Sequence, residues 1–344
     1  MERRDGRRYV PLAVRLLAAT RLRPLPAAFA LFVAVQVAFF AWMNAIDFLD
    51  GFRHHGAIVL RYRLYWFEGL SALLVAAVAL RLRVAPAAAA RRLAELAPVD
   101  GHAVPGDLAY PRLLLRGLAV AGIALSIVFT LWVAVAMRAA GEDWPSGVVV
   151  WVLLRNALVF GTVFQCAAYD LHVARLFARA GRAVREVDLF DPAPLQPFGR
   201  QALEGALLWF ALTSLVAFFL FDDLSRRWTV SFLALLAGLS LVLLVLPAAG
   251  VRGRVRAAKA EEAERVRALL RRARDGALAP GAEKDEAPLR LGALASYLQL
   301  VTSAREWPFD APTLVRIGLT LALPLGSWLG GALVERLVGW ALGG

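Results

Sequence analysis

Long apolar runs separated by polar stretches dominate the hydrophobic pattern of this chain. A helix needs roughly 20 residues to cross a hydrocarbon core of about 30 Å, and runs of that order fall at residues 25–47, 65–84, 113–137, 147–168, 203–221, 229–249 and 312–338. The pattern predicts an all-α, polytopic membrane protein with seven transmembrane helices. The composition agrees, because 60% of the 344 residues are hydrophobic, which a water-soluble domain does not tolerate without large exposed apolar patches.

The distribution of arginine predicts the orientation of these spans. Residues 1–24 are basic and hold no apolar run suited to a cleavable signal. Basic residues are also frequent in the segments 81–116, 169–204 and 250–311, and such residues gather in cytoplasmic loops. We expect a cytoplasmic N-terminus, a C-terminus outside and a multi-pass protein of the cell membrane, taken to be a bacterial inner membrane. The net charge of +12 then reflects topology, and no nucleic-acid partner is expected.

Four parts follow from this pattern: a basic cytoplasmic segment (1–24), a six-span bundle (25–249), a cytoplasmic helical hairpin (250–311) and a seventh span (312–344). In the hairpin, a charged helix continues the sixth span and a second helix covers about residues 289–305. This hairpin is expected to pack on other span extensions or on a second subunit. Its candidate assembly residues are Leu294, Leu298, Val301 and Trp307.

The last span carries a stripe of polar and small residues at helical spacing. The stripe consists of Arg316, Thr320, Pro324, Ser327, Gly331 and Glu335, which share one helix face. One interpretation is close packing against another helix, with glycines allowing the backbones to approach. The other is a hydrated pathway in which Pro324 frees a carbonyl and Glu335 gives the outer mouth negative charge. A ligand pocket is a third alternative.

Charges within the apolar runs are further candidates, since each costs about 2.5–3.5 kcal/mol on insertion scales. Arg155 is the deepest, and it is expected either to be held by a carboxylate or by carbonyls, or to serve in gating or anion attraction. Arg316 is a second candidate, although its place near a span end also allows snorkelling. Asp188 and Asp191 flank a proline-rich turn, where capping is favoured over paired-carboxylate catalysis.

The sequence offers little for catalysis or metal binding. The single cysteine, Cys166, excludes an intramolecular disulfide, and no cluster of cysteine and histidine suits zinc. His54 and His55 are favoured as a solvated pair in an outer loop over a metal site. No glycine-rich phosphate loop, nucleophile elbow or metalloprotease pattern occurs. We therefore expect no cofactor, no metal and no enzymatic activity.

The layout of the chain resembles that of the insect odorant and gustatory receptor channel superfamily. The shared features are seven spans, a cytoplasmic N-terminus, short outer loops, cytoplasmic continuations of spans 4 and 6, and a cytoplasmic helix before the last span. No motif is shared, so no functional residue is carried over. The resemblance implies a homo-tetramer assembled through cytoplasmic helices, with the last span lining a pore.

Two functions are expected from the pattern and the resemblance. The first is an oligomeric ion channel or channel-like receptor, in which ions or a small ligand are the partners besides the lipid bilayer. The alternative is a non-conducting membrane sensor, scaffold or accessory subunit whose cytoplasmic helices bind a partner.

Overall fold

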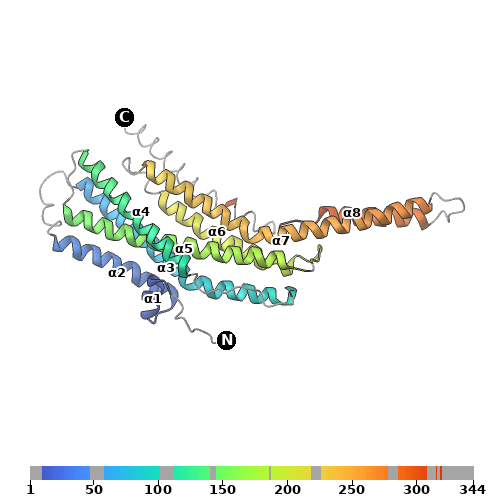
Figure 1. Ribbon diagram of the computed structural model, residues 1–344, viewed down its shortest axis with the longest axis horizontal. Coiled ribbons are helices and arrows are strands. Elements are labelled where there is room, and N and C mark those ends of the chain that lie inside the picture. The colour runs from blue at the N-terminus through green and yellow to red at the C-terminus, as the bar shows by residue number, and fades with distance from the viewer. Residues whose placement is uncertain are drawn as a thin grey trace, which may run out of the picture.

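The computed structural model describes residues 10–46, 58–100, 112–139, 145–185, 187–217, 226–277, 286–307, 315, 318 and 319. All regular structure in these ranges is helical, which confirms the predicted all-α class. The helices lie side by side in an elongated bundle, and one pair of helices projects from it as an arm (Figure 1).

Five helices of the described chain are long and apolar enough to cross a membrane. These helices match five of the seven predicted apolar runs, and they are α2 (Pro24–Ala45), α3 (Ile58–Asp100), α4 (Arg112–Ala139), α5 (Ser146–Ala183) and α7 (Arg226–Ala277). Of these five runs, only the one at 25–47 extends beyond its helix, by two residues. The predicted run at 203–221 falls largely in α6 (Gln196–Ala217), which is not among the five. The run at 312–338 lies almost wholly outside the described residues. The structure thus shows a helical protein with several membrane-capable helices.

The helices of the bundle alternate in direction along the chain. Thr130 of α4 meets Asn156 of α5, and Gly122 meets Phe160, so these two helices are antiparallel. On the other side of α5, Phe160 meets Phe232 of α7, and Ala178 meets Gly250, so α5 and α7 are parallel. Helix α5 lies at the centre and packs against α3, α4 and α7. Such alternation is what successive crossings of a membrane produce.

The basic N-terminal segment is partly folded onto the bundle. Helix α1 (Leu12–Ala19) buries Ala13, Val14 and Leu17. Arg83 of α3 donates hydrogen bonds to the carbonyl oxygens of Leu17 (2.7 Å) and Leu22 (3.0 Å). These contacts attach the start of the chain to α3, so this part of residues 1–24 is packed.

The outer faces of α2 and α4 are apolar and exposed. Only a small part of each span is buried within the single chain. Such a surface suits lipid, because a soluble monomer rarely exposes a contiguous apolar patch of this extent. The exposed side chains include Leu25, Phe29, Val33, Val37 and Phe40 on α2, and Leu113, Val120, Ile127, Val128, Leu131 and Val135 on α4.

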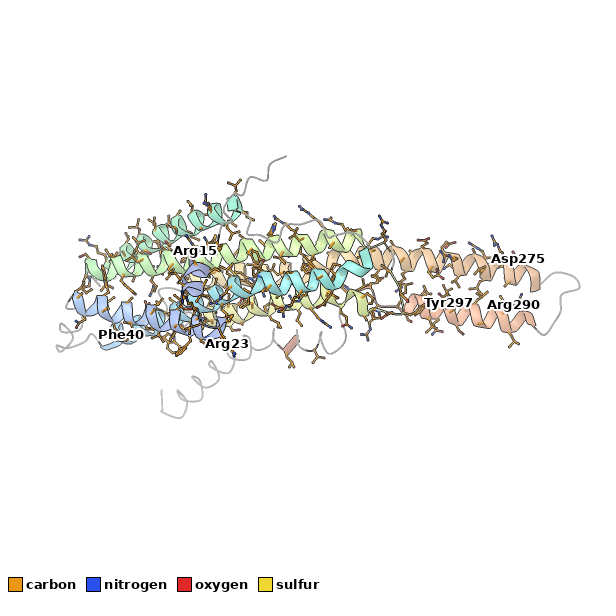
Figure 2. All side chains as sticks on the ribbon, turned by 90° about the horizontal axis from the view of Figure 1, so that it is seen from below. Arg15, Arg23, Phe40, Asp275, Arg290 and Tyr297 are labelled. Atoms are coloured by element: carbon orange, nitrogen blue, oxygen red, sulfur yellow. The ribbon has the colours of Figure 1, made fainter. Side chains whose placement is uncertain are left out.

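Helix α7 continues far beyond the bundle and forms the arm with α8 (Glu286–Ser303). Its 52 residues correspond to a length of about 78 Å at 1.5 Å per residue, more than twice the thickness of a hydrocarbon core. Helix α8 packs back along α7, and Tyr297 Oη donates to Glu262 Oε1 at 3.2 Å. Figure 2 shows Asp275 and Arg290 together near the tip and Tyr297 nearer the bundle. The expected helical hairpin is therefore present, while its side of the membrane stays a prediction.

Two glycines allow α5 and α7 to approach closely where the bundle meets the arm. A Cβ atom at Gly250 would collide with the backbone of Ala178, and one at Gly181 would lie 2.6 Å from the amide nitrogen of Val251. Real Cβ atoms do not approach backbone atoms this closely, so only glycine fits. One turn further along α7, Gly253 is exposed, and a Cβ atom there would meet nothing within 4 Å.

The two α7 glycines give a matched test of this contact. Gly250→Ala is expected to lower the free energy of unfolding by about 1–3 kcal/mol, because overpacking forces the helices apart. Gly253→Ala adds the same methyl group in open space and is expected to stabilise the helix by about 0.5–1 kcal/mol. The measurement is thermal unfolding of both variants in one detergent, followed by circular dichroism. An equal rise in melting temperature for both would contradict the close approach.

Candidate functional site

Two clusters of polar side chains lie inside the apolar bundle. We call the first the Glu68 cluster, and its members are Glu68 of α3, Trp151, Arg155 and Asn156 of α5, and Thr130 of α4. We call the second the Arg81 cluster, and its members are Arg81 and Arg92 of α3, Asp170 of α5, and Gln201, Glu204 and Trp209 of α6. Buried charges are costly in apolar surroundings, so each of them needs a partner that stabilises it.

In the Glu68 cluster a buried carboxylate faces a buried guanidinium. Glu68 has no exposed surface, and its Oε2 accepts a hydrogen bond from Trp151 Nε1 at 3.0 Å. Arg155 Nη1 lies 3.7 Å from the same oxygen. Arg155 Nε and Nη2 donate to Asn156 Oδ1 at 3.3 and 3.2 Å, and Asn156 Nδ2 donates to Thr130 Oγ1 at 3.0 Å. The cluster thus connects three helices.

The structure supports one of the two interpretations of Arg155, that a carboxylate holds it inside the protein. Glu68 falls within the predicted run 65–84; it lies inside the apolar span Tyr65–Leu96 of α3 and is fully buried. Its position at the edge of an apolar run, next to Trp66 and Phe67, was the signal available in the sequence.

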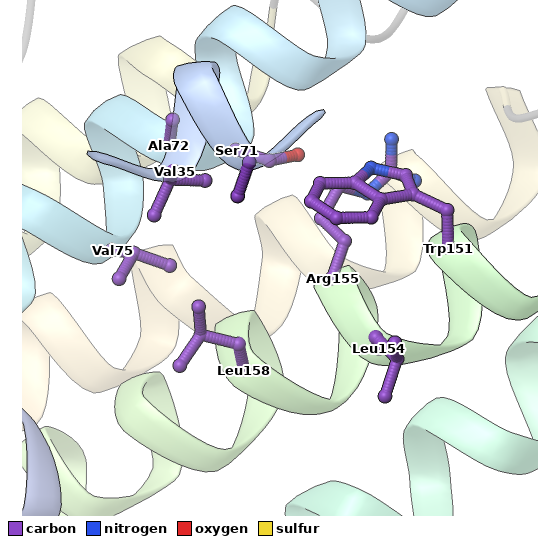
Figure 3. A pocket seen from close by; sticks show the side chains of 9 residues that line it. Val35, Ser71, Ala72, Val75, Trp151, Leu154, Arg155 and Leu158 are labelled. Atoms are coloured by element: carbon purple, nitrogen blue, oxygen red, sulfur yellow. The ribbon is translucent and has the colours of Figure 1, made fainter. Parts of the chain in front are cut away.

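A cavity of about 160 Å³ adjoins the Glu68 cluster between α2, α3 and α5. Figure 3 shows Arg155 and Trp151 on one side of it and Val35, Val75 and Leu158 on the other. Its remaining lining comes from Ser71, Ala72, Ala38 and Leu154. The walls are mostly apolar, with Arg155 as the one charged residue that lines the cavity.

The Arg81 cluster joins α3, α5 and α6. Arg81 Nε and Nη2 donate to Asp170 Oδ1 at 3.2 and 3.1 Å, and Trp209 Nε1 donates to Asp170 Oδ2 at 2.9 Å. Arg81 Nη1 also pairs with Glu204, which in turn pairs with Arg92. Arg81 and Asp170 are only 6% and 2% exposed. Two cations therefore face two carboxylates, so the cluster is electrically balanced.

The sequence alone does not single out the Arg81 cluster. Arg81, Asp170 and Glu204 fall in segments expected to be cytoplasmic, at the ends of apolar runs, where charges are ordinary. Each partner comes from a different run, and no spacing in the sequence indicates that they meet. The available signal was that Arg81 lies within the apolar run 65–84 itself.

The loop between α5 and α6 confirms the capping interpretation of two aspartates. Asp188 Oδ1 accepts hydrogen bonds from the backbone amides of Phe190 (2.8 Å) and Asp191 (3.3 Å). Asp191 Oδ1 accepts one from the amide of Ala193 at 3.0 Å, at the start of the short helix η2 (Ala193–Leu195). Both carboxylates therefore hold a turn, as aspartate commonly does.

The candidate assembly residues pack within the single chain. Val301 is fully buried, and Leu294 and Leu298 are half-buried between α8 and α7. Trp307 packs against a cluster formed by Ala202 of α6 and Ala248 of α7. These side chains hold the arm together, and their role between subunits stays a prediction.

The segment after α8 is fixed to α7 by charged side chains. Lys259 Nζ donates to the carbonyl of Ala304 at 2.9 Å and lies 3.9 Å from Glu306 Oε1. Arg252 lies 3.8 Å from Glu306 Oε2, and its guanidinium sits 4.4 Å from the centre of the Trp307 ring. We call Arg252, Lys259, Glu306 and Trp307 the arm junction. Elsewhere on the arm, desolvation and the Glu262 carboxylate raise the pKa of Tyr297.

The stripe of the last span lies outside the described residues. This holds for Arg316, Thr320, Pro324, Ser327, Gly331 and Glu335, and also for His54 and His55. Of that span only Val315, Gly318 and Leu319 are described, and all three are exposed. No group of three or more metal-ligating side chains occurs within the described ranges.

Comparisons with protein-family models, with curated proteins and with solved structures found no match to the chain. The class of the protein therefore rests on its own fold. Several long apolar helices, an apolar outer surface and balanced charges in the interior define a helical membrane protein.

The Arg81 cluster predicts a large difference between buried and exposed aspartates. Asp170→Asn leaves Arg81 with one carboxylate in place of two and is expected to lower the free energy of unfolding by about 3–5 kcal/mol. Asp275→Asn makes the same chemical change at a side chain that is 67% exposed and is expected to stay within about 0.5 kcal/mol. Thermal unfolding and the yield of monodisperse protein provide the measurement. Similar losses for both variants would contradict the role of the buried pair.

Proposed function

We propose that the chain crosses the membrane seven times with its N-terminus inside, α6 and residues 312–338 supplying the remaining two spans. The alternating directions of α4, α5, α6 and α7 support this count. The orientation is supported by charge: the exposed arginines Arg175, Arg179 and Arg182 lie at the far end of α5, on the same side as the arm (Figure 1). Basic residues favour the cytoplasmic side.

We further propose that the protein is an oligomeric ion channel or channel-like receptor. The arm junction is the observation that carries this proposal, because it fixes the segment just before the last span to α7. Arg252, Lys259 and Glu306 form charged contacts, and Trp307 packs on the bundle. Movement of the arm is thereby transmitted to the last span, whose polar stripe lines the pathway. Subunits assemble through the arms, and the tetramer is the number that the resemblance favours.

A non-conducting sensor, scaffold or accessory subunit is the second candidate. It is favoured by apolar side chains on the exposed side of the arm, among them Leu269 (42% exposed), Leu289 (75%) and Leu300 (57%). In this function they contact a different protein, and the stripe of the last span is packed against another helix.

Labelling of introduced cysteines tests the orientation directly, because the single native cysteine is buried. Cys166 has no exposed surface, so the native chain is expected to resist a membrane-impermeant maleimide. Ser146→Cys and Ser303→Cys each place one thiol at an exposed position, at the start of α5 and at the end of α8. In intact spheroplasts only the first is expected to react, and lysis is expected to expose the second. The reverse pattern would contradict the orientation.

Subunit number and conductance test the channel. We expect the detergent-purified protein to be a symmetric oligomer by mass photometry, and Glu335→Gln and Ser327→Leu to reduce its current in planar bilayers, since they alter the charge and the width of the pathway. Glu95→Gln, at a side chain of α3 that is 49% exposed and lies outside the arm, is the matched control and is expected to conduct normally. A monomer would contradict the channel, and unchanged current in both stripe variants would remove the stripe from the pathway.

A further inference from the structure

Two buried polar atoms of the Glu68 cluster have no hydrogen-bond partner in the structure. They are Arg155 Nη1 and Glu68 Oε1. Glu68 is completely buried, and the Arg155 side chain is only 11% exposed. Buried polar groups are nearly always hydrogen-bonded, and the ion pair of Arg155 Nη1 with Glu68 Oε2, at 3.7 Å, is longer than a hydrogen bond. Arg155 also lines the cavity between α2, α3 and α5, so a missing partner has room there.

We propose that this cavity binds a small neutral amphiphile. Its hydroxyl or carbonyl oxygen accepts a hydrogen bond from Arg155, and its apolar body lies among Val35, Val75 and Leu158. The ligand is neutral because Arg155 already faces the carboxylate of Glu68 at 3.7 Å. An anion would compete with that carboxylate for Arg155, and a cation would be repelled by Arg155.

The dimensions of the cavity set the size of the ligand. Its volume is about 160 Å³, and apolar protein cavities of about 150 Å³ bind benzene. A single-ring molecule with one polar group therefore matches both the volume and the chemistry. Ordered water fits less well, because Arg155 and Ser71 supply only the minimum of the two to four polar partners that a buried water has, and the other walls are mostly apolar.

The ligand reaches the cavity from the lipid. Two of the lining residues, Ala38 of α2 and Leu154 of α5, lie on the exposed apolar surface of the bundle, and Leu154 is 54% exposed. A neutral amphiphile concentrates in the bilayer, so it arrives beside this opening without crossing water. The site lies within the described bundle, and its occupancy does not depend on whether the protein conducts ions.

The test uses two probes of nearly equal size that differ in one polar group. The full chain in nanodiscs is titrated with 4-fluorophenol and with 4-fluorotoluene, and binding is followed by ¹⁹F NMR against empty nanodiscs. The phenol is expected to bind saturably and at least about tenfold more tightly than the toluene, because a hydrogen bond to a charged donor contributes about 1.5–3 kcal/mol. Equal affinities would overturn the role of Arg155. Signals identical to those of empty nanodiscs would overturn the site and leave water as its occupant.

A matched pair of variants locates the binding. Ala38→Phe places a ring at the mouth of the cavity and is expected to abolish saturable binding of 4-fluorophenol. Ala34→Phe makes the same change one turn earlier on α2, at an exposed residue that does not line the cavity, and is expected to bind as the native chain does. Both positions are exposed, so circular dichroism and gel filtration are expected to match those of the native protein. Retained binding in Ala38→Phe, or equal loss in both variants, would overturn the assignment to this cavity.

Discussion

Pairing of opposite charges inside an apolar bundle is the constraint on which the rest of this structure depends. Arg81 and Asp170 are almost completely buried, and the same aspartate accepts a hydrogen bond from Trp209. A charge alone in such surroundings is strongly unfavourable, and removal of one member of a buried pair leaves the other uncompensated. Because the partners come from α3, α5 and α6, their pairing fixes how these helices are placed against one another. Arg155 and Glu68 impose the same condition nearer the other end of α3.

The close contact of α5 with α7 extends this arrangement from the bundle to the arm. Gly181 and Gly250 remove the side chains that would separate the two helices, so their backbones meet. Helix α7 then continues as one helix into the arm, and α8 returns along it to the arm junction. The ion pair between Lys259 of α7 and Glu306 attaches the segment after α8 to α7. The arm, the bundle and the approach to the last span therefore form one connected body, which gives the proposed assembly and gating a physical route.

The Glu68 cluster differs from the Arg81 cluster in the balance of its hydrogen bonds. Every charged group of the Arg81 cluster faces an opposite charge. In the Glu68 cluster one guanidinium nitrogen and one carboxylate oxygen stay without hydrogen bonds beside an apolar cavity. An incompletely satisfied buried network is less stable than an apolar core, so these two atoms favour a further hydrogen-bond partner at this site. The difference suggests that the two clusters have separate roles, one structural and one for recognition.

The sequence by itself determined the features that depend on local pattern. Apolar runs of sufficient length predicted seven spans, of which the described residues show five as membrane-capable helices. The charge pattern after residue 250 predicted the hairpin, and Asp188 and Asp191 predicted a capped turn. Only the tertiary structure decided which charges meet. Arg81 lies 89 positions from Asp170 and 123 from Glu204. In the same way, no spacing in the sequence indicates that Glu68 meets Arg155. Periodicity indicates which face of a helix is buried, but the partner of a buried charge follows from how separate helices pack together.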